Sequence, residues 1–220
     1  MSTIATSFPN NDISARASLR TLRVDGVDVF YRGAGAPDAP VLLLLHGFPA
    51  SSHMFRDLIP RLAGRYRVIA PDMPGFGFTE VPPDRGYTYS FDGLTGTMSA
   101  FVETLGLKRY ALYVFDYGAP VGFRLVLAHP ERVSAIVSQN GNAYEEGLGA
   151  AWGPFQRYWR DPSAANREAL RDALTLETTR WAYTHGVPDP RAVAPETYHL
   201  DAGLLPGSQA AAARDLGQAR

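Results

Sequence analysis

The feature that most restricts the fold is a regular alternation of short apolar runs with segments of helical periodicity between residues 41 and 141. The first run, "VLLLL", begins at Val41, and an uninterrupted apolar run of this kind is typical of a strand covered on both faces. Later runs at 66–72, 110–115 and 133–141 have a similar character. Because helical patterns separate these runs, the order predicts an α/β fold with a mostly parallel, doubly wound sheet.

A hairpin is expected before this alternation, and a change of character after it. The stretch "LRTLRVDGVDVFYRG" (19–33) holds two alternating runs joined by Asp-Gly at 25–26, a strong signal for a tight hairpin. From about residue 144 onward the sequence contains no convincing strand pattern. We therefore expect an α/β core at 1–143, a helical cap or lid at 144–205, and a disordered tail at 206–220.

The expected cap has clear helix starts and many aromatic side chains. Asp161 followed by Pro162 predicts one helix start, and Pro195 predicts another, because proline is favoured at the first helical position. The aromatic residues of this part are Trp152, Phe155, Tyr158, Trp159, Trp181, Tyr183 and Tyr198. Two interpretations stay open: these rings fill the core of a small helical unit, or they form a lid over a pocket.

Composition excludes several classes of function. The chain is 45% hydrophobic and 20% charged, with a formal net charge of −1, which gives no reason to expect nucleic acid or a membrane surface as partner. The apolar runs are too short to span a bilayer, and no secretory signal is evident, so a cytoplasmic location is expected. The absence of cysteine excludes thiol catalysis. No metal-ligand spacing and no phosphate-binding loop occurs, so neither a metal nor a cofactor is expected.

The motif with the clearest chemical meaning is "VFDYG", residues 114–118, at the junction of a predicted strand and a predicted helix. A nucleophile elbow occupies this position in hydrolases, usually as G-x-S-x-G. Its sharp bend needs small neighbours, which Gly118 and Ala119 supply. The alternative is that Asp116 only caps the following helix, a common role for aspartate.

Two other loops are expected at the same edge of the sheet. "HGFPASSHMF" (46–55) follows the first apolar strand, and "APDMPGFGFTE" (70–80) follows the next. The carboxyl ends of parallel strands meet at one edge, which is where a doubly wound sheet places its ligand. We therefore expect the loop at 46–55 to lie beside Asp116, where an oxyanion loop belongs.

With these segments, residues 20 to 205 resemble the α/β-hydrolase superfamily. The resemblance is to the branch with an aspartate nucleophile, which contains epoxide hydrolases and haloalkane or haloacetate dehalogenases. It implies that Asp116, an anion at neutral pH, attacks a saturated carbon and forms an ester. It also implies an oxyanion hole made by the backbone N–H groups of Phe48 and Tyr117. The substrate would be a small molecule, either an epoxide or another alkyl electrophile.

The residues beside the nucleophile favour the epoxide hydrolase-like member of this branch. Similar haloalkane dehalogenases hold the halide with a tryptophan and an asparagine, at positions that are Tyr117 and Phe48 here. Epoxide hydrolases use cap tyrosines to protonate the opening epoxide, and Tyr158 and Tyr183 are the candidates. Trp152 is a further candidate for the substrate pocket. A haloalkane or haloacetate dehalogenase-like hydrolase is the alternative.

A catalytic histidine is not found where the resemblance implies one, after the last strand and beyond the cap. Each of the histidines present is better explained by a surface or packing role, and the acid position at 140 is an asparagine. Two strand and helix units, roughly 60 residues, are expected in addition. We therefore expect the C-terminal strands to be missing, and the strand at 133–139 to be an exposed edge available for self-association. A catalytically inactive binding or interaction protein with this fold stays open as an alternative.

Overall fold

The strands form one mostly parallel sheet. The computed structural model describes residues 16–204, without the side chains of Glu145 and Ala151; the tail expected at 206–220 lies outside this range. The strand order in the sheet is β1-β2-β4-β3-β5-β6. The strands are β1 (Ser18–Val24), β2 (Val27–Ala34), β3 (Val41–Leu45), β4 (Arg67–Pro71), β5 (Tyr110–Phe115) and β6 (Val133–Gln139). The β1–β2 hairpin and the β2–β4 pair are antiparallel, and the other pairs are parallel, so the predicted α/β sheet is confirmed.

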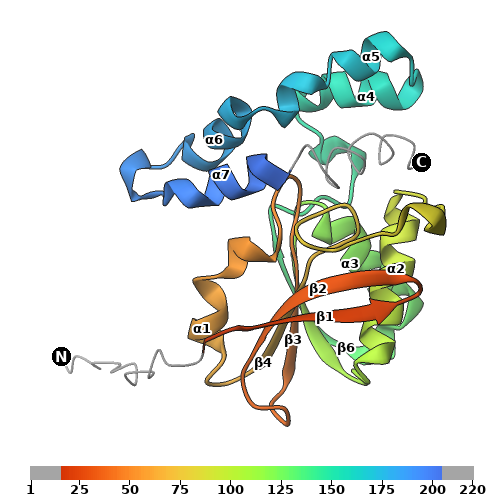
Figure 1. Ribbon diagram of the computed structural model, residues 1–220, viewed down its shortest axis with the longest axis vertical. Helices are drawn as coiled ribbons and strands as arrows, with labels where there is room; N and C mark the ends of the chain where they lie inside the picture. The colour runs from red at the N-terminus through yellow and green to blue at the C-terminus, as the bar shows by residue number, and fades with distance from the viewer. Residues whose placement is uncertain (1–15, 205–220) are drawn as a thin grey trace.

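Helices cover both faces of the sheet and extend beyond one end of it (Figure 1). Three lie along the sheet: α1 (Leu58–Leu62), α2 (Phe91–Thr104) and α3 (Gly118–Ala128). Four follow β6: α4 (Gly153–Arg160), α5 (Ala164–Glu168), α6 (Leu176–Thr184) and α7 (Pro195–Leu204). Short 3-10 turns connect them: η1 (Ser52–Phe55), η2 (Pro83–Arg85), η3 (Pro130–Arg132), η4 (Glu145–Gly147), η5 (Ala150–Trp152), η6 (Arg171–Leu174) and η7 (Pro190–Ala192).

One predicted helix start is wrong. Asp161 is the C-cap of α4, in an extended conformation, and α5 begins only at Ala164. The N–H of Asp161 donates to the carbonyl oxygen of Arg157 at 2.9 Å, so Asp161 completes the last turn of α4 and does not open the next helix. The side-chain oxygen of Ser163 caps α5 instead, by accepting the backbone N–H of Asn166 at 3.4 Å. The start predicted at Pro195 is confirmed.

The core consists of two apolar layers, one on each face of the sheet. Alternate residues of β3 point to opposite faces, as expected for a strand: Leu43 and Leu45 pack with Met98 and Phe101 of α2, whereas Leu42 and Leu44 pack with the η1–α1 side. Leu43, Leu44 and Leu45 have no exposed surface. This two-sided burial explains why the strand is a continuous apolar run in the sequence.

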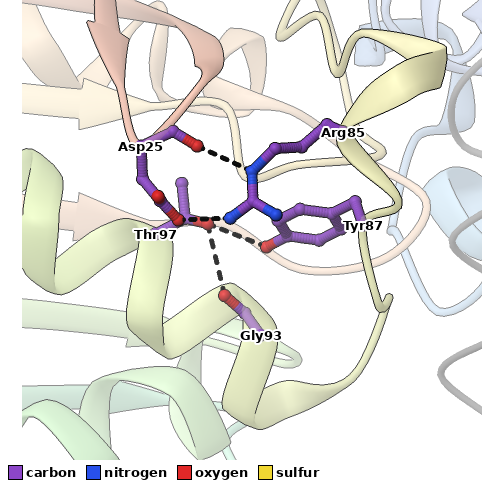
Figure 2. A network of polar contacts seen from close by, with 5 residues as sticks. All are labelled: Asp25, Arg85, Tyr87, Gly93 and Thr97. Carbon is purple, nitrogen blue, oxygen red and sulfur yellow. Dashed lines mark hydrogen bonds and ion pairs between the residues drawn. The ribbon is translucent and has the colours of Figure 1, made fainter.

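The tip of the hairpin is tied to the segment before α2 (Figure 2). Arg85 donates from Nε to the carbonyl oxygen of Asp25 at 2.9 Å, and from its terminal nitrogen to the Asp25 carboxylate at 2.6 Å. The hydroxyl groups of Tyr87 and Thr97 are 2.9 Å apart, and Thr97 also donates to the carbonyl oxygen of Gly93. Burial raises the pKa of Tyr87 to about 12, so its hydroxyl stays protonated. Arg85 and Tyr87 thus connect the tip of the hairpin to α2 through the segment that precedes this helix.

No helix within residues 16–204 is long and apolar enough to cross a membrane.

Candidate functional site

Asp116 lies directly after β5 in a left-handed backbone conformation, with φ of +48°. Non-glycine residues seldom adopt this conformation, and where they do, strain at a functional site is a frequent cause. The N-cap of α3 is Tyr117, and no side chain caps this helix. The alternative interpretation of Asp116 as a simple helix cap therefore does not describe its position.

Three glycines allow the backbone to pass this close to the bend. A Cβ atom on Gly47 would lie 2.3 Å from the Cβ atom of Asp116, and one on Gly118 would lie 2.3 Å from the carbonyl oxygen of Leu45. A Cβ atom on Gly122 would meet the Val114 side chain at 2.4 Å. Contacts this short are not tolerated, so only glycine fits where the loop after β3, the bend and α3 meet.

The carboxylate of Asp116 is held by the loop that follows β3. Its Oδ1 atom accepts the backbone N–H of Phe48 at 2.8 Å. Burial raises the pKa of Asp116, and the backbone N–H groups of Phe48 and Tyr117 counteract this by stabilising the anion. The two amide groups expected to form an oxyanion hole are thus the ones that act on the Asp116 carboxylate.

A second aspartate, whose role the sequence analysis did not predict, connects the loops around the bend. Asp72 is fully buried at the end of β4; its Oδ1 accepts the N–H of Ser52 at 2.7 Å, and its Oδ2 accepts the N–H of Phe78 at 2.9 Å. A Cβ atom on Gly77 would lie 2.0 Å from Asp72 Oδ2. The only sequence signal for this role is an aspartate that follows a strand and precedes a glycine-rich turn.

His46 makes a further connection between the same two loops. Its Nε2 accepts the N–H of Met73 at 3.0 Å, and its Nδ1 lies 3.1 Å from the carbonyl oxygen of Gly47. Since a carbonyl oxygen can only accept, the proton is assigned to Nδ1. Burial lowers the pKa of His46, so the ring stays neutral. Both ring nitrogens are occupied by the backbone, and His46 is therefore a structural residue of the loop.

Cavities between the sheet and the helices that follow β6 contain the predicted site residues. One of about 740 Å³ is lined by Asp116, Phe48 and Tyr183. A second of about 430 Å³ is lined by Asp116, Tyr117 and Trp152. A third of about 300 Å³ is lined by Phe48, Tyr117 and Tyr158, and does not include Asp116. The structure thus places the three aromatic residues predicted for the substrate pocket around the bend, in different cavities.

The two tyrosines predicted for the substrate pocket have different surroundings. The hydroxyl group of Tyr183 donates to Oδ2 of Asp201 at 2.5 Å. Tyr158 is almost completely buried, with the guanidinium carbon of Arg167 at 6.0 Å from its ring centre. Tyr183 is the one that shares a cavity with Asp116. Nothing in the sequence indicated its pairing with Asp201, because the partners lie 18 positions apart on separate helices.

Asn140, at the end of β6, lines both of the cavities that contain Asp116. It also has a positive φ, of +50°. No histidine within residues 16–204 lines any of the three cavities. In the same part of the chain no group of histidine and carboxylate side chains is arranged to hold a metal ion.

Comparison with known proteins gives consistent results. A family model described as alpha/beta hydrolase fold matches residues 40–190. An uncharacterized hydrolase of Saccharomyces cerevisiae is 50% identical over 188 residues, which are 82% of this chain and 63% of the yeast protein. A haloalkane dehalogenase of Psychrobacter cryohalolentis is 37% identical over 113 residues, or 51% of this chain and 37% of that enzyme. The chain thus spans less than two thirds of the length of either relative.

A solved structure with a similar fold is the epoxide hydrolase VrEH1 of Vigna radiata. It superimposes with a TM-score of 0.73 and 24% sequence identity, over 92% of this chain and 71% of the other. At this level of identity, the likeness concerns the arrangement of the strands and helices.

Proposed function

The chain belongs to the alpha/beta hydrolase fold family, and from this membership we propose that it is a hydrolase with Asp116 as nucleophile, of the epoxide hydrolase-like type. One observation carries the proposal. The carboxylate of Asp116 stands on a strained bend, is held by a backbone amide of the neighbouring loop, and lines two cavities. A carboxylate that served only the fold would not need to face a cavity.

The two oxygens of Asp116 have different tasks in this proposal. Oδ1 is held by the N–H of Phe48, and Oδ2 attacks a saturated carbon of the substrate, forming an ester. When water later attacks the ester carbonyl, the negative charge develops on Oδ1. That atom already accepts the N–H of Phe48, and the N–H of Tyr117 also acts on the carboxylate, so the two amides would stabilise the tetrahedral intermediate.

The second half of the reaction needs a base to activate water, and histidine is the residue that most often does so. No histidine within residues 16–204 lines the cavities around Asp116, and His46 has both ring nitrogens bound to the backbone. We therefore propose that this chain carries out the first half-reaction and stops at the ester. Its small-molecule substrate is an epoxide or a related alkyl electrophile.

Tyr183 favours an epoxide over a halide. An opening epoxide leaves as an alkoxide and needs a proton, whereas a halide leaves as a stable anion. Tyr183 lines the cavity that contains Asp116. Its hydroxyl group is a proton donor, kept in its protonated form because burial and the nearby Asp201 charge raise its pKa. A haloalkane or haloacetate dehalogenase-like activity is the second candidate, favoured by the identity with the Psychrobacter enzyme.

We further propose that residues 144–205 act as a cap on an α/β core formed by residues 1–143. The cavities support this division, because each is lined by residues of both parts: Phe48 with Tyr158 in one, and Asp116 with Tyr183 or Trp152 in the others. Substrate bound at Asp116 would be enclosed between the loops of the sheet and α4–α7.

The test is covalent labelling. The 220-residue chain is incubated with a terminal aryl epoxide and followed by intact-mass and peptide mass spectrometry, with diol release measured in parallel. We expect one stable adduct per chain, located on Asp116, and no sustained release of diol.

The variant Asp116→Asn is the control and should take up no label, because a carboxamide is a poor nucleophile. Continuous diol production would contradict the arrest at the ester, and labelling elsewhere but not at Asp116 would contradict the nucleophile itself. An inactive binding protein would show neither labelling nor diol.

A further inference from the structure

Asp201, on α7, is a buried carboxylate with an incomplete set of hydrogen bonds. Only 1% of its surface is exposed. Its Oδ2 accepts the hydroxyl group of Tyr183 at 2.5 Å, while its Oδ1 is buried and has no hydrogen-bond partner within residues 16–204. An ionised carboxylate with one unsatisfied buried oxygen is unfavourable. The arrangement therefore favours a proton on Asp201.

The protonation of Asp201 decides what Tyr183 can do. A phenol has one proton to donate, and Tyr183 gives it to Asp201. While Asp201 is ionised, the hydroxyl group is not available as a donor to the cavity that it shares with Asp116. When Asp201 is protonated, its carboxyl group can donate to the Tyr183 oxygen. The phenolic proton is then free to point into the cavity.

One hydrogen-bonding group and two charged groups act on Asp201, each from a different element. Tyr183 faces it from α6, Arg56 from the segment after η1, and Asp72 from the end of β4. Arg56 is partly engaged elsewhere, with Asp57 at 3.3 Å and the carbonyl oxygen of His53 at 3.4 Å. Burial is the largest influence and, together with the charge of Asp72, raises the pKa of Asp201 to about 6 against the opposing effects of Tyr183 and Arg56. A proton is therefore present on Asp201 for part of the time near neutral pH.

We propose that Asp201 and Tyr183 form a proton relay for oxygen leaving groups in the Asp116 cavity. The inference rests on the proposed function, since it needs Asp116 to attack an electrophile there. Tyr183 is the catalytic acid that touches the leaving oxygen, and Asp201 is the positioning residue that supplies the proton through Tyr183.

The relay step balances in atoms and charge. Oδ2 of Asp116 forms a bond to carbon as the carbon–oxygen bond of the epoxide breaks. The leaving oxygen takes the phenolic proton of Tyr183, and Tyr183 takes the carboxyl proton of Asp201. The product is a hydroxyalkyl ester on Asp116, a neutral Tyr183 and an ionised Asp201. One negative charge has moved from Asp116 to Asp201, and no other reactant is needed.

A halide leaves without a proton, which provides the control reaction. The rate of adduct formation on Asp116 is measured between pH 5 and 8 with a terminal epoxide and with a primary alkyl iodide. Any titration of Asp116 itself affects both reagents equally. The readout is therefore the rate of adduct formation with the epoxide divided by the rate with the iodide. In the unmodified chain we expect this ratio to fall as the pH rises through about 6, approaching tenfold per pH unit.

Three variants separate the relay from packing. Tyr183→Phe should slow the epoxide reaction about 100-fold and leave the iodide reaction within twofold. Asp201→Asn, whose amide can hydrogen-bond Tyr183 but has no acidic proton to supply, should slow the epoxide reaction and remove the pH dependence of the rate ratio. Tyr198→Phe is the matched control, because its ring lies 6.4 Å from that of Tyr183 on the same helix as Asp201; it should behave like the unmodified chain. Thermal melting verifies that each variant is folded.

The failure of the relay and the failure of the proposed function have different signatures. If Asp116 is labelled by both reagents with the same pH dependence, or if Tyr183→Phe does not affect epoxide labelling, the relay is wrong and the nucleophile stands. If neither reagent labels Asp116, the proposed function and the catalytic relay fall together. The titration of Asp201 is checked independently by the ring carbon resonances of isotopically labelled Tyr183. In the unmodified chain the chemical shifts of these carbons should change with a midpoint near pH 6, and in Asp201→Asn this change should be absent. If the chemical shifts do not change in the unmodified chain, the relay is also wrong.

Discussion

Asp116 has a strained backbone, and one oxygen of its side chain accepts a hydrogen bond from the neighbouring loop. The backbone passes so close to Asp116 that the residues around it must be small. Its φ of +48° costs on the order of 1 kcal/mol or more for a non-glycine residue. The surrounding packing maintains this conformation: Gly47 lies against the Asp116 side chain, and Gly118 lies against the carbonyl oxygen of Leu45. The position of Asp116, the proposed nucleophile, is thus set by where side chains are absent as much as by where they are present.

Gly47→Ala should therefore abolish labelling of Asp116 while the chain remains folded. The added methyl group would lie 2.3 Å from the Asp116 Cβ atom, so the loop or the carboxylate must move and the hydrogen bond from Phe48 is lost. We expect a loss of about 2 kcal/mol in the free energy of unfolding, as for overpacking of other tight sites. Chemical denaturation and mass spectrometry measure the two effects.

The matched control is Gly96→Ala. Gly96 lies within α2, is exposed, and has nothing within 4 Å of an added Cβ atom. Since alanine is the better helix former, this variant should gain roughly 0.5–1 kcal/mol and label normally. Equal behaviour of the two alanine variants would show that the close approach at Gly47 has no functional importance.

The bend itself could be predicted from the sequence, because its signal is local. At 114–119 the end of a strand is followed by Asp116, then by Tyr117 and two small residues. Asp72 and Asp201 could not be assigned their roles in this way, because their partners are brought near only by the fold. Asp72 binds amides of two loops, from Ser52 and Phe78, and neither amide has a recognisable signal in the sequence.

At the scale of elements, the site is built where the loops after β3 and β4 are joined beside the end of β5. Asp72 binds the N–H groups of Ser52 and Phe78, and His46 accepts the N–H of Met73. The hydrogen bonds from Ser52 and Met73 are buried and that from Phe78 is partly buried, so water competes little with them. They fix the loop that carries Phe48, and with it the amide that holds the Asp116 carboxylate.

Asp72→Asn should loosen these loops. An asparagine side chain offers one acceptor oxygen, so its NH₂ group must face one of the two N–H donors that the carboxylate now satisfies. We expect a destabilisation of about 3 kcal/mol and faster proteolysis within the loops 46–57 and 72–80. Urea unfolding and limited proteolysis followed by mass spectrometry are the measurements.

Asp92→Asn provides the comparison for this element. Asp92 is an exposed residue whose carboxylate pairs with Arg124 at 2.8 Å. Exposed pairs contribute little, so the change should stay within about 1 kcal/mol. If the two asparagine variants unfold alike, Asp72 does not have the connecting role given to it here.

The sequence was most informative for elements with strong periodicity and least informative at their ends. The strands and α2 follow clear apolar patterns, and burial on both faces makes β3 unmistakable. By contrast, apolar residues recur at helical spacing from Met54 to Leu62, but the structure has η1 and a separate short helix, α1. Asp161 and Pro162 together favour a helix start, but Ser163, two positions after Asp161, caps the helix instead.

For the molecule as a whole, the two edges of the sheet differ in chemistry. The outer strand at one edge is β1, which carries the exposed charges of Arg20 and Arg23. The outer strand at the other edge is β6, where Ile136 and Val137 are 44% and 50% exposed. Within residues 16–204, β6 pairs with β5 alone. Charged edge strands resist pairing with other chains, whereas apolar ones invite it.

The chain should therefore self-associate through β6. Val137→Lys places a charge on this strand and should weaken the association about tenfold or more, seen by analytical ultracentrifugation over a range of concentrations. Leu127→Lys is the control. Leu127 is 82% exposed on α3, so this substitution also removes an exposed apolar side chain, but it leaves the strand unchanged. A chain that is monomeric at all concentrations, or a Leu127→Lys effect as large as that of Val137→Lys, would contradict this prediction.

The difference between the edges also limits how far such an assembly can grow. A filament requires two unlike surfaces that fit each other, one at each end of the repeating unit. Here the exposed arginines of β1 disfavour pairing with the aliphatic strand, although β1 also exposes Leu19. We therefore expect the aliphatic edge to meet its own copy across a two-fold axis. Such a contact would use up both binding surfaces, and growth should end with a pair of chains.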